Sequence, residues 1–166
     1  SDMARRRIRR LYTALVHGRF ATPTGTVDAP IGRDPDRPTR RAVAPGGKPA
    51  VTHYEVVEEF ALADVSLLDV ALATGRTHQI RVHAAYAGHP VAGDDKYGDR
   101  EKNTVLRQYG LNRMFLHAAS IGVNRPGTHE PLHVSAPLGD DLRAVLDALV
   151  KAPGSPRGAA RRRARS

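Results

Sequence analysis

The sequence predicts an α+β domain built on a mainly antiparallel mixed sheet with a few helices. Three observations lead to this class. Runs typical of strands outnumber runs typical of helices, strands and helices do not alternate regularly as in a parallel α/β fold, and no internal repeat is present. The 166 residues are enough for one domain with a sizeable core and too few for two.

The expected strands are runs of β-branched and apolar residues bounded by glycine, proline or polar turns. The segments 51–60 and 65–72 are close enough in sequence to pair as a hairpin. Residues 22–50 hold six of the twelve prolines, so they predict mostly loop. Gly46 and Gly47 then turn the chain into the next strand. In order, the expected strands are 11–16, a short strand within 25–30, 51–60, 65–72, 115–123 and 132–136.

Three helices are expected. Thr77 is a plausible N-cap for a helix that runs through Tyr86 and ends before Gly88 and Pro90. Its predicted buried stripe consists of Ile80, Ala84 and Ala87, with Arg81 at the edge. A short charged helix is expected between Gly98 and Tyr109, ended by Gly110. A closing helix over 140–150 places apolar residues on one side, namely Leu142, Val145, Leu146 and Leu149.

The two ends of the chain are strongly basic. Residues 1–10 are expected to form a basic arm, residues 11–150 the folded domain, and residues 151–166 a disordered basic tail of low complexity. The net charge of +9 favours polyanionic partners, above all RNA, through salt-dependent phosphate contacts. Only four of the 26 basic residues are lysines. A GC-rich genome would explain that arginine bias equally well, but it would not explain the net charge.

The remaining composition limits the class of protein. The absence of cysteine excludes disulfides, thiolate metal sites and thiol nucleophiles, and it suits a reducing cytosol. No apolar run approaches the length of a membrane span, so we expect a soluble, cytoplasmic protein without a membrane partner. We expect a monomer, although the sequence does not determine the oligomeric state.

Metal and hydrolase sites are not favoured. His78 and His83 are five residues apart, about 140° around a helix, whereas two ligands on one face need a spacing of four. Asp94, Asp95 and Asp99 could hold magnesium, but capping of a turn is the favoured role. No nucleophile elbow, glycine-rich phosphate loop or dinucleotide motif is present. We therefore expect neither a metal nor a cofactor.

The most informative segment is Gly75-Arg-Thr-His-Gln-Ile-Arg-Val-His83, followed by Gly88-His-Pro and by Gly93-Asp-Asp-Lys-Tyr-Gly98. It places many hydrogen-bond donors at the start of a helix, whose own N-terminus carries partial positive charge. Taken alone, this pattern indicates only a site that binds polyanions.

These motifs, together with Gly98-Asp-Arg-Glu101, Leu111-Asn-Arg-Met-Phe-Leu-His-Ala118 and Ala136-Pro137, resemble the RluA-type family of pseudouridine synthases. The resemblance runs from about Leu11 to Leu149. It implies isomerisation of uridines in folded ribosomal RNA: the glycosidic bond breaks, the base rotates and is rejoined through carbon five. No cofactor or metal is implied. The target base must leave its stack to be reached.

The resemblance also implies roles for individual residues. Tyr12 corresponds to a tyrosine that packs against the target base, and ordinary core packing is the alternative. Arg81 corresponds to the arginine that pairs with the catalytic aspartate and keeps that carboxylate ionised in a water-poor pocket. The expected RNA-binding residues are Arg76, His78, Gln79, Lys96 and Arg100. For His78 and Gln79, a role in holding the fold together is an equal alternative.

One departure from the family pattern is decisive for activity. The family's catalytic aspartate lies in an Arg-Leu-Asp motif upstream of the tyrosine strand, and this chain contains no such motif. Two hypotheses follow. The chain is the C-terminal portion of a synthase catalytic domain, inactive alone, or it is a non-catalytic RNA-binding module with the same fold elements. The first is favoured because Tyr12 and Arg81 are both retained, and a guanidinium buried without a carboxylate would be costly.

Overall fold

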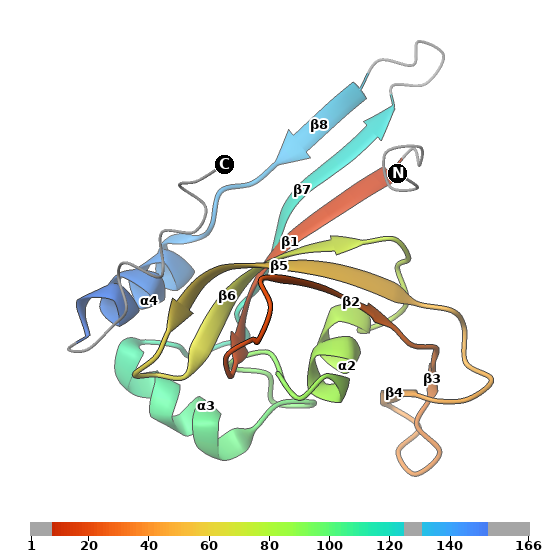
Figure 1. Ribbon diagram of the computed structural model, residues 1–166, viewed down its shortest axis with the longest axis horizontal. Helices are drawn as coiled ribbons and strands as arrows, with labels where there is room; N and C mark the ends of the chain where they lie inside the picture. Colours follow the sequence, from red (N-terminus) through yellow and green to blue (C-terminus); the bar gives the residue numbers. More distant parts are fainter. Residues whose placement is uncertain (1–7, 125–130, 153–166) are drawn as a thin grey trace.

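A six-stranded sheet forms the body of the molecule (Figure 1). The structure is a computed structural model that describes residues 8–124 and 131–152. The sheet order is β2-β5-β6-β1-β7-β8, and β3 and β4 form a separate two-stranded ribbon. The elements are β1 (Ile8–His17), β2 (Thr24–Asp28), β3 (Ile31–Arg33), β4 (Arg41–Val43), β5 (Val51–Phe60), β6 (Val65–Leu72), α2 (Gln79–Tyr86), α3 (Arg100–Leu106), the 3₁₀ turn η1 (Arg107–Tyr109), β7 (Leu116–Asn124), β8 (Pro131–Ser135) and α4 (Asp140–Lys151).

The predicted α+β class with a mainly antiparallel sheet is confirmed. Every pairing between the described strands is antiparallel. The β5–β6 hairpin has the predicted partners, from Thr52 opposite Leu72 to Phe60 opposite Val65. β1 lies in the interior of the sheet, between β6 and β7, so the strand that carries Tyr12 is held by hydrogen bonds along both edges.

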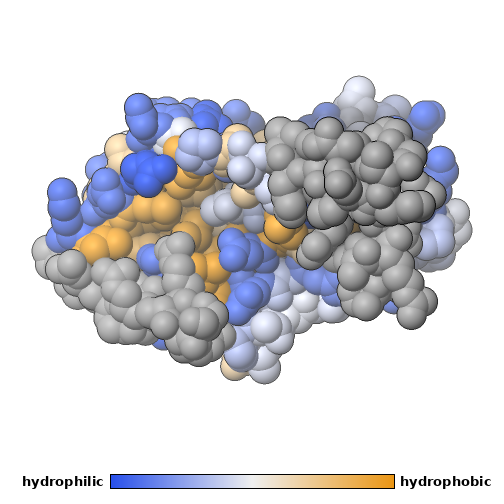
Figure 2. Space-filling view, turned by 90° about the horizontal axis from the view of Figure 1, so that it is seen from above, coloured by the Kyte–Doolittle hydropathy of each residue, from blue (hydrophilic) through white to orange (hydrophobic). Residues whose placement is uncertain are grey.

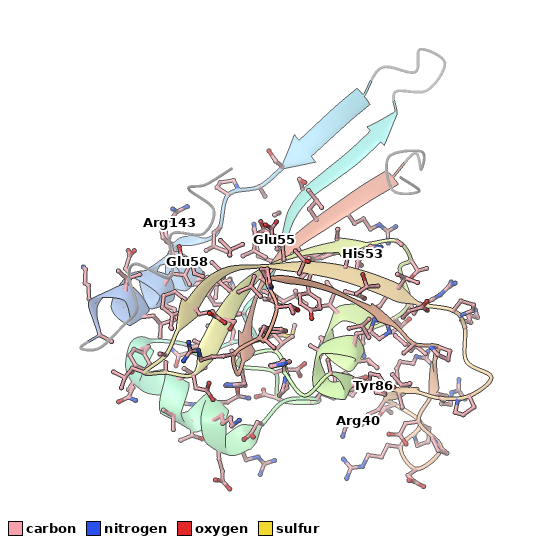
Figure 3. The ribbon with its side chains drawn as sticks, in the orientation of Figure 1. Arg40, His53, Glu55, Glu58, Tyr86 and Arg143 are labelled. Carbon is pink, nitrogen blue, oxygen red and sulfur yellow. The ribbon has the colours of Figure 1, made fainter. Side chains whose placement is uncertain are left out.

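One face of the sheet is open over part of its area. In Figure 1, α2 and α3 lie below the sheet, and Figure 2 views the molecule from the opposite side, where apolar surface gathers between hydrophilic residues. A hollow of about 510 Å³ lies over the adjoining strands β1, β5, β6 and β7. His53 and Glu55 of β5 belong to its lining (Figure 3). Tyr12 also lines this hollow.

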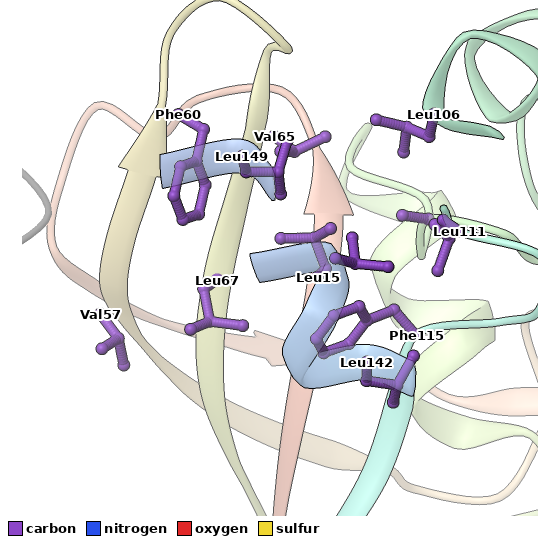
Figure 4. Close-up of a cluster of buried hydrophobic side chains, with 12 residues drawn as sticks. Leu15, Val57, Phe60, Val65, Leu67, Leu106, Leu111, Phe115, Leu142 and Leu149 are labelled. Carbon is purple, nitrogen blue, oxygen red and sulfur yellow. The ribbon is translucent and has the colours of Figure 1, made fainter. Parts of the chain in front are cut away.

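Two apolar clusters hold the helices to the sheet. Because successive residues of a strand point to opposite faces, Leu15 belongs to one cluster while Ala14 and Val16 belong to the other. The first cluster joins β1, β5 and β6 to α4 and is drawn in Figure 4. Its residues from α4 are the predicted Leu142, Val145 and Leu149, each 1% exposed. The second cluster packs Ile80 of α2 against β1, β5 and β6.

The start and the buried face of α2 differ from the prediction. The helix begins at Gln79, and its N-cap is His78, in the left-handed conformation with φ 56°, in place of Thr77. Its buried residues are Gln79, Ile80, Val82 and His83, whereas Ala87 is exposed. The predicted stripe is therefore wrong in part. Apolar periodicity could not find it, because two polar side chains, Gln79 and His83, are buried through hydrogen bonds.

Other boundaries shift by a few residues. β1 begins at Ile8, so residues 8–10 of the predicted basic arm belong to the sheet. The short strands β3 and β4 lie in the segment predicted as loop. The predicted disordered tail lies outside the described residues from 153 onward, as do residues 1–7 of the arm and most of the turn at Asn124–Gly127. Among the described residues, no helix is long and apolar enough to span a membrane.

Candidate active site

The structure brings most of the predicted site residues to one hollow of about 300 Å³ between β1, β6 and the start of α2. Tyr12 comes from β1, Arg76 and His78 from the segment before α2, and Gln79 and Arg81 from α2 itself. Tyr12 is far in sequence from the other four residues, so its meeting with them in one hollow depends on the fold. The other described lining residues are Arg10, Leu72, Gly75, Ile80, Met114 and Leu116.

Tyr12 sits at an irregularity of the sheet. Leu11 is opposite Ser120 on β7, but Tyr12 is opposite Ala118, so a β-bulge interrupts the pairing at this point. Bulges locally twist a strand and re-aim its side chains, and they occur often beside active sites. The ring is partly buried against the cluster that contains Ile80 and Leu116. Tyr12 therefore packs on the core and also borders the hollow.

Arg81 has a carboxylate partner within this chain. Its Nε donates to Asp94 Oδ2 at 2.8 Å and its Nη2 to Asp94 Oδ1 at 2.9 Å, a bidentate pair. The expectation that the chain leaves this guanidinium unpaired is wrong. Among the described residues, the remaining nitrogen Nη1 has no hydrogen-bond partner. The Arg81 side chain is 18% exposed and that of Asp94 is fully buried.

Asp94 is held as a buried anion. Besides Arg81, its Oδ1 accepts hydrogen bonds from the backbone amides of Lys96 and Tyr97 at 2.9 and 3.0 Å. Burial alone would raise the pKa of Asp94, but the hydrogen bonds from Arg81 and from the two amides outweigh it and hold the pKa below its usual range. The same hydrogen bond raises the pKa of Arg81. Both partners therefore stay charged at neutral pH.

A second layer of hydrogen bonds fixes the loop that carries Asp94. Asn103 of α3 donates to the Asp94 carbonyl at 3.1 Å and accepts from the amide of Gly93 at 2.8 Å. The His17 ring contacts Asn103 Oδ1 through Nε2 at 2.8 Å. Because that oxygen is an acceptor, Nε2 must carry the proton. Burial lowers the pKa of His17, which keeps the ring neutral in this role.

Gln79 is a structural residue. It is 2% exposed, and its amide nitrogen donates to the Val51 carbonyl and to Thr52 Oγ1, both at 2.9 Å. Its amide oxygen accepts from Thr74 Oγ1 and from the Arg76 amide. All four hydrogen-bonding positions of the side chain are thus occupied. Of the two roles expected for Gln79, these bonds favour the one that holds the fold together, because they tie the start of α2 to β5 and to the residues that follow β6.

His78 and Arg76 lie at the entrance of α2. His78 Nδ1 lies 2.8 Å from the hydroxyl of Tyr97, and that hydroxyl also accepts the backbone amide of Arg41. The Arg81 guanidinium lies 5.0 Å from the centre of the Tyr97 ring. Arg76 donates from Nε to the Pro49 carbonyl at 2.8 Å. Tyr97 therefore joins His78, Arg81 and β4 in one assembly.

Lys96 and Arg100 are not brought to the hollow. Lys96 Nζ donates to the Thr39 carbonyl at 2.8 Å, and Arg100 is exposed at the first residue of α3. Asp99 caps α3 by accepting from the Lys102 amide. With Asp94 accepting two amides, the favoured capping role is confirmed for Asp94 and Asp99. Within the described ranges, no three His, Asp or Glu side chains are placed to hold a metal ion.

Sequence reasoning missed two residues of the site, Asp94 and Tyr97. The sequence predicts Asp94 only as a turn residue. It lies thirteen positions after Arg81, and no single helix or strand spans the two. The available signal was the spacing in Asp94-Asp-Lys-Tyr97, in which a carboxylate can accept amides two and three residues later. The role of Tyr97 depends on contacts with β4, which was not expected as a strand.

Comparisons with known proteins identify the relatives of this chain. The family model described as RNA pseudouridylate synthase matches residues 1–86. Ribosomal large subunit pseudouridine synthase C of Vibrio vulnificus is 43% identical over 142 residues, which cover 86% of this chain and 44% of the relative. Ribosomal large subunit pseudouridine synthase D of Nitrosomonas europaea is 44% identical over 160 residues, covering 93% and 46%.

A solved structure of a pseudouridylate synthase domain is also similar to this chain. Human RNA Pseudouridylate Synthase Domain Containing 1 superposes with a TM-score of 0.67 at 29% identity, covering 90% of this chain and 69% of that one. The chain spans less than half the length of the two bacterial relatives. The family match covers more than half of the chain and includes Tyr12 and Arg81. The chain belongs to the RNA pseudouridylate synthase family.

Proposed function

We propose that this chain supplies the tyrosine and arginine side of a pseudouridine synthase active site that acts on ribosomal RNA in the cytoplasm. The observation that carries the proposal is the single hollow shared by Tyr12, Arg76, His78 and Arg81. A uridine flipped out of its stack would enter this hollow and pack against Tyr12. During the reaction the bond from N1 to C1′ breaks and the bond from C5 to C1′ forms. The C5 proton leaves and N1 takes up a proton, so that the product is an isomer of the substrate.

The reaction needs a nucleophilic carboxylate, and the proposal places it on polypeptide outside this chain. None of the described residues that line the hollow carries a carboxylate. Asp94 cannot serve, because it is 1% exposed and its oxygens accept from Arg81, Lys96 and Tyr97. The nitrogen Nη1 of Arg81 remains available to hold a second, incoming carboxylate in its ionised form. A longer polypeptide that contains this chain would therefore be the enzyme.

The test is tritium release from ribosomal RNA that carries [5-³H]uridine. We expect release with the full-length protein and no release with the 166-residue chain alone. In the full-length protein, Arg81→Ala should abolish release, while Arg113→Ala, which removes an exposed pair with Asp141, should leave it unchanged. Release by this chain alone would contradict the external nucleophile. An inactive full-length protein would contradict synthase activity.

The alternative is a non-catalytic RNA-binding module, and one observation favours it. The bidentate bond to Asp94 makes Arg81 stable without an external carboxylate, so its retention does not require catalysis. The two functions differ in one outcome. A binding module would bind the same RNA both as this chain and within the full-length protein, and the full-length protein would release no tritium.

A further inference from the structure

A second hollow, of about 410 Å³, lies where the β3–β4 ribbon meets the start of α2. Four basic side chains contribute to its lining: Arg33 from β3, Arg41 from β4, Lys48 from the following turn and Arg76 from the segment before α2. The other lining residues described are Ile31, Gly32, Gly46, Gly47, Gly75 and Thr77. The lining thus combines four cations and four glycines with no acidic residue.

The positive charges of this hollow are not neutralised by the part of the chain that the structure describes. The ion pairs recorded there belong to Arg81 and Arg113, and no carboxylate pairs with the four cations that line the hollow. Arg33 and Arg41 are direct cross-strand partners in the β3–β4 ribbon. Like charges directly opposite one another destabilise a strand pair. A bound anion would remove this repulsion, which explains why two arginines share the position.

Backbone hydrogen bonds hold the ribbon that carries three of the four cations against the rest of the domain. Lys48 and Ile31 exchange two backbone hydrogen bonds at 2.9 Å. Tyr97 accepts the Arg41 amide at 3.0 Å, and the Arg40 guanidinium lies 4.9 Å from the centre of the Tyr97 ring. Figure 3 labels Arg40 on the segment that joins β3 to β4. Arg40 itself does not line the hollow, and its contact with the Tyr97 ring helps to hold the ribbon against the loop that carries Tyr97.

The basic hollow adjoins the candidate active site. Gly75 and Arg76 line both hollows. The Nε of Arg76 is held by the Pro49 carbonyl, and its two terminal nitrogens have no partner among the described residues. A ligand that reaches from one hollow to the other must carry negative charge at one end and a group suited to the Tyr12 hollow at the other. A polynucleotide has this form.

We infer that the hollow between the β3–β4 ribbon and the start of α2 binds backbone phosphates of the RNA strand whose uridine enters the Tyr12 hollow. The inference rests on the proposed function for the identity of the ligand, but its test measures binding and not turnover. Arginine forks match phosphate oxygens bidentately, and the glycines allow the backbone to approach the ligand closely.

The first experiment measures the salt dependence of RNA binding by the full 166-residue chain. A fluorescein-labelled 20-nucleotide oligouridine is titrated between 50 and 200 mM KCl against the triple variant Arg33→Gln/Arg41→Gln/Lys48→Gln. Each phosphate contact on single-stranded RNA contributes about −0.7 to the slope of log K against log salt. The loss of three contacts should therefore make the slope less steep by about 2. The matched control removes the same charge at three exposed positions on α3, η1 and α4, with Lys102→Gln/Arg107→Gln/Lys151→Gln.

The control should change the slope by less than about 0.5, because those positions lie outside both hollows. Equal changes in the two triple variants would overturn the inference, since they would reflect only the total charge. An unchanged slope in the ribbon variant would overturn it as well. Both triple variants should melt at or above the temperature of the unmodified chain, which shows that a lost slope is not a loss of fold.

The second experiment separates RNA phosphates from free phosphate. Backbone amide shifts of Gly46 and Gly47 are followed by NMR during titration with the oligouridine and, separately, with inorganic phosphate. The inference expects shifts at micromolar oligouridine, and expects phosphate to act only at concentrations at least 100-fold higher. Phosphate acting at the same concentration would assign the site to a small anion instead. An inactive full-length synthase with a preserved ribbon effect would refute the proposed function and leave this site standing.

Discussion

Arg81 and Asp94 form a bidentate ion pair at the wall of the candidate active site, at 2.8 and 2.9 Å, with the Asp94 side chain fully buried. The pair accounts for the stability of a largely buried guanidinium in this chain. Asp94 neutralises the guanidinium and orients it, while Nη1 is left without a described partner. A second carboxylate could then join without a rearrangement of α2.

The first prediction concerns the two functions of the Asp94 carboxylate. Asp94→Asn removes the charge but keeps an oxygen that can accept the Lys96 and Tyr97 amides, so it should lower the free energy of unfolding by about 2–3 kcal/mol. Asp94→Ala also loses the amide contacts and should cost about 1–2 kcal/mol more. Urea unfolding measures both changes.

The neighbouring Asp95 supplies the matched control. It is exposed, so Asp95→Asn should change the free energy of unfolding by less than about 0.5 kcal/mol. If Asp94→Asn were as mild as Asp95→Asn, the ion pair would not stabilise the loop at residues 93–97.

A second prediction follows from Gln79, whose four hydrogen-bonding positions are all used inside the protein. Gln79→Leu keeps a similar volume but leaves the Arg76 amide without its partner and the Val51 carbonyl with the Ala73 amide alone, so the free energy of unfolding should fall by about 2–3 kcal/mol. RNA affinity measured well below the melting temperature should be unchanged. A loss of affinity in a folded variant would restore Gln79 as an RNA contact.

A third prediction tests which residue caps α2. Thr77 would be the N-cap by sequence pattern, and the loss of a true N-cap costs about 1 kcal/mol. In the structure the helix begins one residue later, and the N-cap His78 contributes no side-chain capping bond. Thr77→Ala should therefore lower the free energy of unfolding by less than about 0.3 kcal/mol. Thermal unfolding of the single variant is sufficient, and a cost near 1 kcal/mol would favour the helix start read from the sequence.

The capping error illustrates what the sequence could and could not provide. The strands β1, β5 and β6 were predicted because each carries strand-forming residues over eight or more positions. The stripe Leu142, Val145, Leu149 was predicted from its helical spacing. The ribbon β3–β4 escaped because each strand has three residues in a segment rich in proline. A three-residue strand is too short to show a hydrophobic alternation, so only its pairing with a neighbouring strand reveals it.

The residues of the candidate site also differ in how far the sequence could predict them. Tyr12, Arg76, His78 and Arg81 were identified through the family resemblance, and the fold brings them to one hollow. Lys96 and Arg100 belong to motifs of the same resemblance but lie outside this hollow, because a sequence motif does not specify where its side chains point. Asp94 and Tyr97 depend on contacts between a loop, α2 and β4, which are visible only in three dimensions.

The final prediction concerns pH and the buried histidines. His83 is 1% exposed, its Nε2 lies 2.9 Å from the Ala29 carbonyl and its Nδ1 lies 2.7 Å from Thr52 Oγ1. The carbonyl can only accept, so Nε2 carries the proton and Nδ1 accepts from Thr52. Burial lowers the pKa of His83 below its usual value of 6.5, and it lowers the pKa of His17 in the same direction. A second proton on His83 would remove the acceptor that Thr52 uses.

The direction of the pH effect follows from proton linkage. Between the lowered folded pKa and the unfolded value of about 6.5, the unfolded chain binds more protons, so stability rises with pH in that window and is complete above it. We therefore expect the free energy of unfolding to fall as the pH is lowered from 7 towards 5. His83→Gln, which can still donate to Ala29, should flatten this dependence. His53→Gln, whose bond to Thr26 lies at the surface, should leave it in place, and equal pH profiles for all three proteins would assign the acid sensitivity to other groups.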